Sequence, residues 1–308
     1  MMMYSNFKNL FDAYLFIHKV RRVVIGRLID PIVPTISKFK WNILLNNNNF
    51  CGTTKAKRNT EIIISLTSFP ARINVVSKTI KTLLMQTMKP DRVVLWLAEE
   101  QFPYKEADLP LDLIDLTKFG LEIRWTNDIR SYKKLVPALE LFKDAIIITT
   151  DDDLYYSSNL VRSLYRTHVK HPKDIICHRA SKIIESNGKY ALIPGGYDYY
   201  NGASFLNKLV GCSGVLYPVN SLHSLVTKEQ LFMNLAPTND DIWFWFMGIL
   251  NNTKVRVVKN NNPFEHSVEG TQKGEQLSAV NDRGEKLFWK QFFALLRRFP
   301  EIKTKMES

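Results

Sequence analysis

Cysteine is scarce in this 308-residue sequence, which contains only Cys51, Cys177 and Cys212 and no CxxC pair. An odd number of widely spaced cysteines argues against a disulfide framework and for a reducing compartment. A zinc–thiolate site is not expected either, because such sites use closely spaced cysteine pairs. Small disulfide-rich domains and zinc ribbons are therefore poor explanations of this chain.

Long apolar runs are also missing. No stretch approaches the roughly 18 consecutive apolar residues of a membrane-spanning helix, and the longest run is Ile242–Leu250. The N-terminus lacks the basic start, apolar centre and small-residue cleavage site of a secretory signal. Since 45% of the residues are hydrophobic, the chain is able to bury a core as one large α/β domain or two small ones.

Positive charge is concentrated at one end of the chain. Residues 1–58 carry ten basic and two acidic side chains, which gives +8 of the total formal charge of +12. Residues 7–29 mix bases with apolar side chains at helical spacing, and Pro31 and Pro34 then stop any helix. Such a segment suits an anionic membrane surface, although a helix packed on the protein's own surface is an open alternative.

From this pattern we expect residues 1–40 to make peripheral contact with the inner face of the cytoplasmic membrane. Nucleic acid is not an expected partner, because the bases are spaced among apolar residues and no nucleic-acid-binding motif follows. The polar stretch from Asn46 to Asn59 predicts a linker. The sequence thus predicts an N-terminal extension, residues 1–58, and one domain, residues 59–308.

Short apolar runs alternate with helix-length segments in the first half of the domain. This alternation predicts right-handed βαβ units and a mostly parallel sheet flanked by helices. The predicted strands are Glu61–Thr67, Arg92–Leu97, Leu121–Thr126 and Ala145–Thr150, and the predicted helices are Val75–Thr87, Lys133–Lys143 and Ser158–His171. The second half is less regular, with strands expected at 175–178, 190–193 and 254–259 and helices expected after Pro237 and at Leu287–Phe299.

Three consecutive carboxylates, Asp151, Asp152 and Asp153, directly follow the fourth predicted strand. The carboxyl ends of strands are where open α/β sheets bind ligands. Oxygen ligands one residue apart suit a hard divalent cation, Mg²⁺ or Mn²⁺, that also keeps waters or substrate phosphates. A solvated acidic turn that caps the helix near Ser158 is the alternative, and the position after an apolar strand favours the cation site.

The sequence TTDDDLYY at residues 149–156 resembles the Asp-x-Asp motif of nucleotide-sugar-dependent glycosyltransferases with the GT-A fold. The resemblance extends over about residues 60–271 and is nearest to the bacterial polysaccharide, O-antigen or exostosin-like types. It implies a Rossmann-like α/β domain that moves a sugar from a nucleoside diphosphate, UDP in our expectation, to a hydroxyl of a glycan or lipid-linked acceptor. Asp151 and Asp152 would face ribose and metal, and Asp153 would bind the metal.

The resemblance also implies further ligand-binding residues. In several such families a late histidine completes the metal shell, which implies His266, and imidazole suits Mn²⁺ better than Mg²⁺. The implied metal ligands are therefore Asp151, Asp153 and His266. The residues implied to bind the nucleotide sugar are Thr67, Phe69, Arg72, Asp128, Lys133, Lys134, Asp151, Asp152 and Gly214. An ordinary basic surface near a helix start is the alternative for the arginine and the lysines.

An acidic pair, Asp240 and Asp241, matches the carboxylates near the acceptor in this family. In an inverting enzyme such a carboxylate is the general base for the acceptor hydroxyl, and we favour Asp241. The alternative is that both acids only favour the start of a helix, which Asn239 or Asp240 would cap. The implied acceptor contacts are Tyr197, Tyr199 and Trp243. The Gln-x-x-Arg-Trp signature of a common branch is absent, which leaves the stereochemistry open.

Two other functions remain open. A sugar-phosphate nucleotidyltransferase also uses an α/β sheet with acidic metal ligands, but it carries a glycine-rich loop after the first strand, and residues 65–72 contain no glycine. A non-enzymatic basic adaptor for membrane or nucleic acid would depend on residues 1–58 and not on the acidic triplet.

Overall fold

The computed structural model describes residues 31–47, 49–186, 189–193, 202–259, 266–271 and 287–307. The chain divides into two compact units, Met1–Asn48 and Asn49–Ser308. In the first unit, the described residues form helix α2 (Val33–Leu45), which has a proline in its first turn and no acidic residue there. None of the helices in the described ranges is both long enough and apolar enough to cross a membrane.

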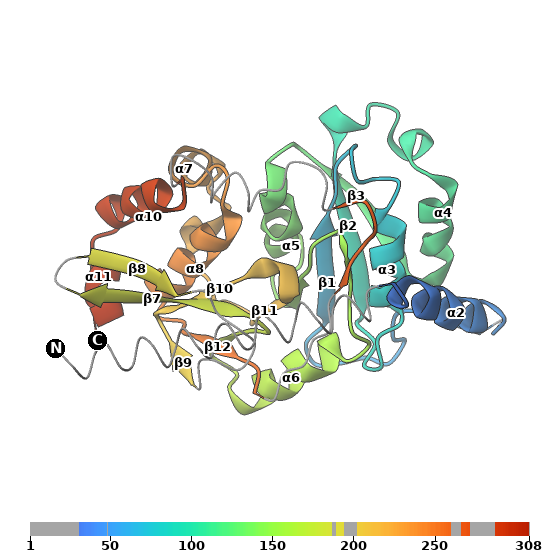
Figure 1. Ribbon diagram of the computed structural model, residues 1–308, viewed down its shortest axis with the longest axis horizontal. Coiled ribbons are helices and arrows are strands. Elements are labelled where there is room, and N and C mark those ends of the chain that lie inside the picture. The colour runs from blue at the N-terminus through green and yellow to red at the C-terminus, as the bar shows by residue number, and fades with distance from the viewer. Residues whose placement is uncertain are drawn as a thin grey trace. The chain divides into compact units, whose positions relative to one another are not determined.

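The second unit is built on an eight-stranded sheet with the order β3-β2-β1-β4-β11-β6-β12-β9 (Figure 1). Among these strands only β11 and β9 run against the others, so the sheet is mostly parallel. Its first four strands are β1 (Ile62–Thr67), β2 (Arg92–Ala98), β3 (Leu121–Thr126) and β4 (Ile146–Thr149). The predicted fold class is confirmed, and these strands end within one residue of the predicted positions.

The central strands form because their side chains are apolar on both faces. Ile62–Ile64 of β1 and Ile146–Ile148 of β4 are almost completely buried, as expected for parallel strands with a helix layer on each side. Figure 1 shows α3 (Val76–Leu84) and α4 (Leu111–Ile114) on one side of these strands and α5 (Val136–Leu141) on the other.

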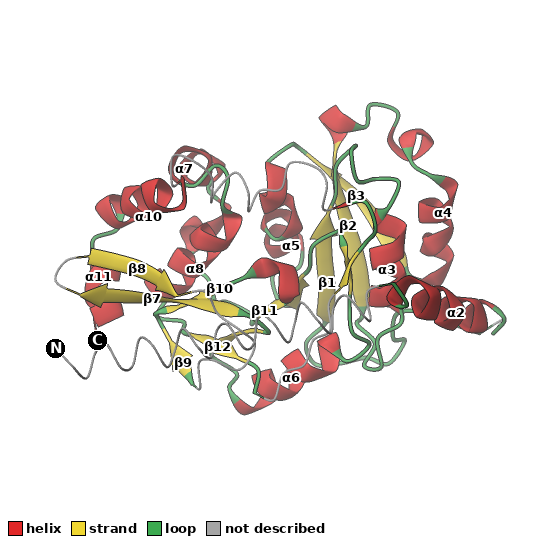
Figure 2. Ribbon diagram, in the orientation of Figure 1, coloured by secondary structure: helices red, strands yellow, loops and turns green. Residues whose placement is uncertain are grey.

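The other half of the unit combines the end of the large sheet with a small sheet and helices (Figure 2). Its strands are β6 (Ile175–Cys177), β7 (Ala180–Ser186), β8 (Lys189–Ile193), β9 (Ala203–Ser204), β10 (Asn207–Leu209), β11 (Val215–Tyr217) and β12 (Val255–Val257). The two-stranded sheet of β5 (Leu154–Tyr155) and β13 (His266–Ser267) instead lies beside α3 in the first half. Its helices are α6 (Leu160–Lys170), α7 (Glu229–Leu235), α8 (Asp240–Leu250), α10 (Leu287–Arg298) and α11 (Glu301–Glu307). Short 3₁₀ turns include η4 (Arg130–Lys134) and η5 (Gly211–Ser213).

Helix α8 lies in the centre of the aromatic core. Its side chains from Ile242 to Met247 have no exposed surface, which is the behaviour of a helix that is apolar on every side. The indole N–H of Trp243 donates to the carbonyl of Val226 over 3.0 Å. The predicted acceptor contact of Trp243 is therefore wrong, because its ring is packed inside the core and presents no face to a ligand.

Two predicted boundaries differ from the structure. Residues 50–58, expected in a linker, belong to the second unit: the Gly52 N–H donates to the Phe119 carbonyl over 2.7 Å, and Arg58 pairs with Asp91 at 2.6 Å. The helix predicted at 133–143 is instead the turn η4 followed by the short helix α5. Proline in the first turn of α5 favours a helix start at that point, so the chain restarts there instead of continuing one helix.

Candidate active site

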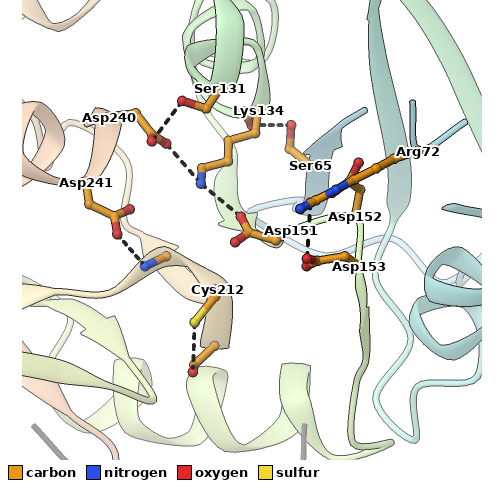
Figure 3. A network of polar contacts seen from close by, with 12 residues as sticks. Ser65, Arg72, Ser131, Lys134, Asp151, Asp152, Asp153, Cys212, Asp240 and Asp241 are labelled. Carbon is orange, nitrogen blue, oxygen red and sulfur yellow. Dashed lines mark hydrogen bonds and ion pairs between the residues drawn. The ribbon is translucent and has the colours of Figure 1, made fainter. Parts of the chain in front are cut away.

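The topology gathers several loops at one edge of the sheet. The loops after β1, β3 and β4 all leave the carboxyl ends of parallel strands. Strand β11 runs antiparallel to β4, with Val215 opposite Thr149, so the turn η5 before β11 reaches the same edge. The first turn of α8 completes the set, and Figure 3 shows the resulting polar network.

Asp152 is the buried counter-ion of Arg72. The Arg72 Nη1 lies 2.7 Å from Asp152 Oδ1 and 3.1 Å from Asp153 Oδ2. Ser68 donates to the other oxygen of Asp152 over 2.6 Å, and Asp152 is only 5% exposed. Both oxygens of Asp152 are thus used inside the protein. It fixes the guanidinium of Arg72, and the nucleotide contact that the resemblance implied for it stays a prediction.

The ionised form of Asp153 is disfavoured by its surroundings. Burial, followed by the neighbouring charge of Asp151, raises the pKa of Asp153 to about 6, and Arg72 only partly opposes this. Burial also raises the pKa of Asp152. The loop after β4 therefore holds more negative charge than Arg72 neutralises, so Asp153 would gain from a nearby cation.

Lys134 bridges two halves of the network. Its Nζ lies 3.0 Å from Asp151 Oδ1 and 2.9 Å from Asp240 Oδ2, and Figure 3 shows the ammonium between them. Burial alone would lower the pKa of this lysine, but Asp151, Asp240 and Asp241 together raise it well above its usual range. Lys134 therefore stays charged and serves as a counter-ion, and the base or phosphate contact that the resemblance implied for it stays a prediction.

Asp241 lies at the start of α8, on the other side of Lys134 from the acidic loop (Figure 3). The Asn239 side chain accepts the Ile242 N–H over 3.1 Å, which confirms the predicted helix cap. The Gly211 N–H donates to Asp241 Oδ2 over 2.9 Å, whereas Oδ1 is buried and has no hydrogen-bond partner among the residues that the structure describes. Burial and the charge of Asp240 raise the pKa of Asp241, against the effect of Lys134.

Gly211 is required at its position because a side chain would collide with its neighbours, and not because its backbone has a positive φ angle. A methyl group added there would lie 2.5 Å from Asp241 Oδ1 and 3.1 Å from Lys134 Nζ. The glycine therefore lets the backbone approach both charged groups. The resemblance implied Gly214, at the end of the same turn, as a contact to the nucleotide sugar. Gly214 has φ +88° and packs on Leu160.

The other predicted nucleotide contacts are spread along the edge. Thr67 donates to the Trp96 carbonyl over 2.8 Å at the end of β1. Phe69 is 38% exposed, and the Arg72 guanidinium lies 5.6 Å from its ring centre. Lys133 and Asp128 pair with each other at 2.6 Å. Tyr197 and Tyr199 lie outside the described residues.

Two further groups that the sequence did not reveal hold the site together. The Asp151 N–H donates to the Tyr156 hydroxyl over 2.9 Å, and that hydroxyl donates to the Cys212 carbonyl over 2.6 Å. His178 lies 2.7 Å from Ser163 Oγ and 3.0 Å from the Ser213 carbonyl. Burial lowers the pKa of His178 to about 4, so the ring is neutral near pH 7 and supports the η5 turn.

The predicted three-ligand metal set is not assembled. In the part of the chain that the structure describes, no three His, Cys, Asp or Glu side chains are grouped to hold a metal ion. His266 lies on β13 opposite Tyr155 and does not join Asp151 and Asp153 in such a group. The resemblance implied His266, whose strand pairs with the residues that directly follow Asp153, and its part in a metal site stays a prediction.

The charge balance nevertheless fits a divalent cation. The network contains five aspartates, Asp151, Asp152, Asp153, Asp240 and Asp241, against Arg72 and Lys134. Full ionisation would leave a formal charge of −3. Mg²⁺ and Mn²⁺ are commonly held by one or two carboxylates together with waters and substrate phosphates, and Asp151 and Asp153 meet that requirement.

No protein-family model matches the chain, and no curated protein matches it significantly. Among solved structures it is similar to S. aureus TarS 1-349 (TM-score 0.44, 12% identity, 68% of this chain covered) and to the same protein in complex with UDP-GlcNAc (0.46, 14%, 71%). It is also similar to the mannosyltransferase PcManGT from Pyrobaculum calidifontis in complex with GDP-Man and Mn²⁺ (0.48, 10%, 89%).

This chain spans 60% and 61% of the length of the two TarS structures and 74% of the mannosyltransferase. At these low identities and scores, function has to be inferred from the residues of the site itself.

Proposed function

We propose that this protein is a metal-dependent glycosyltransferase of the GT-A type, acting on a nucleoside diphosphate sugar whose nucleotide is UDP. The transferred group would be a hexose or an N-acetylhexosamine, and the acceptor a hydroxyl of a glycan or lipid-linked oligosaccharide. One observation carries the proposal. An acidic loop with uncompensated charge lies beside a fixed arginine at the carboxyl edge of the sheet, with Asp241 across Lys134 from it.

On the donor side, Asp151 and Asp153 would hold Mn²⁺ or Mg²⁺, which supplies positive charge to the departing diphosphate when bound. Arg72 is held by Asp152 and Asp153 through Nη1, which leaves its other N–H groups to bind diphosphate oxygens. Because Asp152 and Ser68 fix this geometry before the donor arrives, Arg72 needs little reorganisation.

On the acceptor side, Asp241 is placed to act as the general base. Its Oδ2 is fixed by the Gly211 N–H, and within the described part of the chain its Oδ1 has no hydrogen-bond partner. That oxygen would take the proton of the acceptor hydroxyl while the hydroxyl oxygen bonds to the anomeric carbon. The bond between the anomeric carbon and the phosphate oxygen breaks, and the diphosphate leaves with the electron pair.

Thermal unfolding in a panel of nucleotide sugars tests this proposal. We expect a UDP-sugar to raise the melting temperature with Mn²⁺ and not with EDTA, because a ligand that binds only the folded state at 100 times its Kd adds about 2.7 kcal/mol. UMP lacks the diphosphate that would bridge to the metal, and it should give a much smaller shift. The absence of both Mn²⁺-dependent stabilisation and Mn²⁺-dependent sugar release would disprove the proposed activity.

We also propose that the N-terminal unit contacts anionic membrane lipid, which places the enzyme beside a lipid-linked acceptor at the cytoplasmic membrane. On α2, the exposed apolar side chains Ile36, Phe39 and Ile43 follow at spacings of three and four residues, so they share one helix face. Lys38 and Lys40 are also exposed on this helix. Apolar side chains flanked by lysines suit the interface of an anionic bilayer.

Co-sedimentation with vesicles of phosphatidylglycerol and phosphatidylcholine measures this contact. The double change Phe39→Ser and Ile43→Ser should lower binding at least about tenfold, because each buried apolar side chain contributes about 1.5–3 kcal/mol. Leu111→Ser is the matched control, since Leu111 is 79% exposed but lies in the second unit. Equal binding by the wild type and the double variant would contradict a role for this helix face.

A further inference from the structure

We propose that Lys134 is a positioning residue that couples the donor half of the site to the acceptor half, by sharing one buried ammonium between Asp151 and Asp240. This inference rests on the proposed function, because it assigns Asp151 to the donor side and Asp241 to the acceptor side. It differs from the phosphate contact that the sequence suggested for Lys134, since the ammonium is used between protein carboxylates.

Both ends of Lys134 are fixed by different elements. Its carbonyl accepts the hydroxyl of Ser65 on β1 over 2.6 Å, and the Trp96 indole donates to the same hydroxyl over 3.0 Å. Its ammonium meets Asp151 after β4 and Asp240 on α8. One residue therefore connects three elements that are far apart in the sequence, through its backbone carbonyl to β1 and through its side chain to Asp151 and Asp240.

Asp240 transmits this contact to the base. Its Oδ2 pairs with Lys134 and its Oδ1 accepts the Ser131 hydroxyl over 2.9 Å, so the first turn of α8 is held from two sides. Asp241 is the next residue in that turn, and Gly211 fits closely against both Asp241 Oδ1 and Lys134 Nζ. Loss of the ammonium would free the turn that aims Asp241.

The same ammonium opposes a cation at Asp151. Lys134 Nζ and a divalent ion would both interact with that carboxylate, and two cations repel each other in a partly buried site. Donor binding with its metal would thus draw Asp151 away from Lys134 and leave Asp240 as the principal partner of the ammonium. In this way, binding of the donor and its metal at Asp151 would strengthen the contact between Lys134 and Asp240, which positions Asp241 on the acceptor side.

The test compares Lys134→Met, Lys134→Arg and Asp240→Asn with the wild type. We expect Lys134→Met to lower kcat about 10–100-fold with a smaller change in donor KM, as expected when the geometry of reacting groups is lost. Calorimetric Mn²⁺ titration without donor should show severalfold tighter binding for Lys134→Met and no such change for Lys134→Arg, which keeps the charge. Lys134→Arg should also regain a substantial part of the lost kcat.

Asp240→Asn should lower kcat and weaken Mn²⁺ binding severalfold, because the ammonium is then left with Asp151 as its principal partner and competes more strongly with the cation. Because Lys134 and Asp240 act as one contact, the double variant Lys134→Met, Asp240→Asn should have a kcat no lower than that of Lys134→Met alone. The coupling would be overturned if the fold-decreases in kcat of the two single variants multiplied in the double variant. It would also be overturned if Lys134→Met left kcat and Mn²⁺ affinity unchanged. If Lys134→Met does not fold, Asp240→Asn tests the coupling by itself, because an unchanged kcat in that variant would also overturn the proposal.

These results are distinguishable from failure of the proposed function. A wild-type protein that neither binds Mn²⁺ nor uses any nucleotide sugar would refute the glycosyltransferase assignment. The pairing of Lys134 with Asp240 would then be judged by melting temperatures. If the decreases in melting temperature of the two single variants simply added in the double variant, the pairing would be refuted as well.

Discussion

Asp241→Asn is expected to lower kcat by about 10²–10⁴-fold, the usual contribution of a general base. The amide nearly matches the carboxylate in shape, so the Gly211 N–H keeps its acceptor oxygen. What is lost is the ability to take a proton from the acceptor hydroxyl. Donor binding, measured by the Mn²⁺-dependent melting shift with a UDP-sugar, should stay close to that of the wild type.

Asp115→Asn is the matched control, because Asp115 is an exposed aspartate paired with Lys118 far from the network. It should leave kcat within about twofold of the wild type, as surface substitutions usually do. Burial and Asp240 raise the pKa of Asp241, so the base is lost to protonation as the pH falls. The wild-type rate should therefore decline on the acid side, and Asp241→Asn should flatten that decline. A variant with wild-type kcat would assign the proton transfer elsewhere.

Local sequence patterns were sufficient for the central strands and for the position of the acidic loop. The isoleucine runs of β1 and β4 indicate buried strands because they are short and consist of β-branched residues, which favour strands over helices. The position of Asp151 and Asp153 at the carboxyl edge of the sheet then follows, because they come directly after β4 in the chain. Asn239 was also predictable as a cap, since its side chain acts on a backbone N–H only three residues away.

The roles of Asp152 and Lys134 could not be predicted in this way. Asp152 is neutralised by Arg72, which is 80 residues away in the sequence, and no pattern within the acidic triplet distinguishes it from its neighbours. Lys134 looked like a surface lysine near a helix start. Its burial depends on the interruption between η4 and α5 and on the distant Asp240.

The second half of the sheet was the least predictable part of the fold. Its strands β6, β11 and β12 have only three residues each, so their apolar patterns carry little information about order or direction. The antiparallel placement of β11 nevertheless brings Gly211 to Asp241. The contact that fixes the candidate base therefore depends on the part of the topology that sequence patterns specify least.

Asp153→Asn is expected to abolish the Mn²⁺-dependent response to a UDP-sugar and to lower turnover by about 100-fold or more, comparable to the loss of one preorganised electrostatic contact to the developing charge. An amide oxygen binds a hard cation more weakly than a carboxylate does, and it leaves less charge to hold the ion. The measurements are the melting shift with Mn²⁺ and donor, calorimetric Mn²⁺ binding, and the initial rate of transfer.

The stability of the metal-free variant separates this outcome from simple damage to the fold. The pKa of Asp153 is raised to about 6 in the folded protein, above its ordinary value of about 3.9. Folding therefore favours the protonated carboxyl, and the stability present at low pH is lost as the pH rises through about 6. Above that pH the wild type carries an unfavourable charge that asparagine lacks.

At pH 7.5 with EDTA, Asp153→Asn should consequently melt at or above the wild-type temperature, although the lost pairing with Arg72 offsets part of the gain. Asp152→Asn provides the contrast: burial raises the pKa of Asp152 as well, but both of its oxygens accept hydrogen bonds, from Ser68 and Arg72. An amide keeps only one acceptor oxygen, so the loss of one of these contacts should lower the melting temperature. A destabilised Asp153→Asn that still binds Mn²⁺ would make Asp153 a structural partner of Arg72. A stable variant that has lost Mn²⁺ binding requires the carboxylate to face the cation.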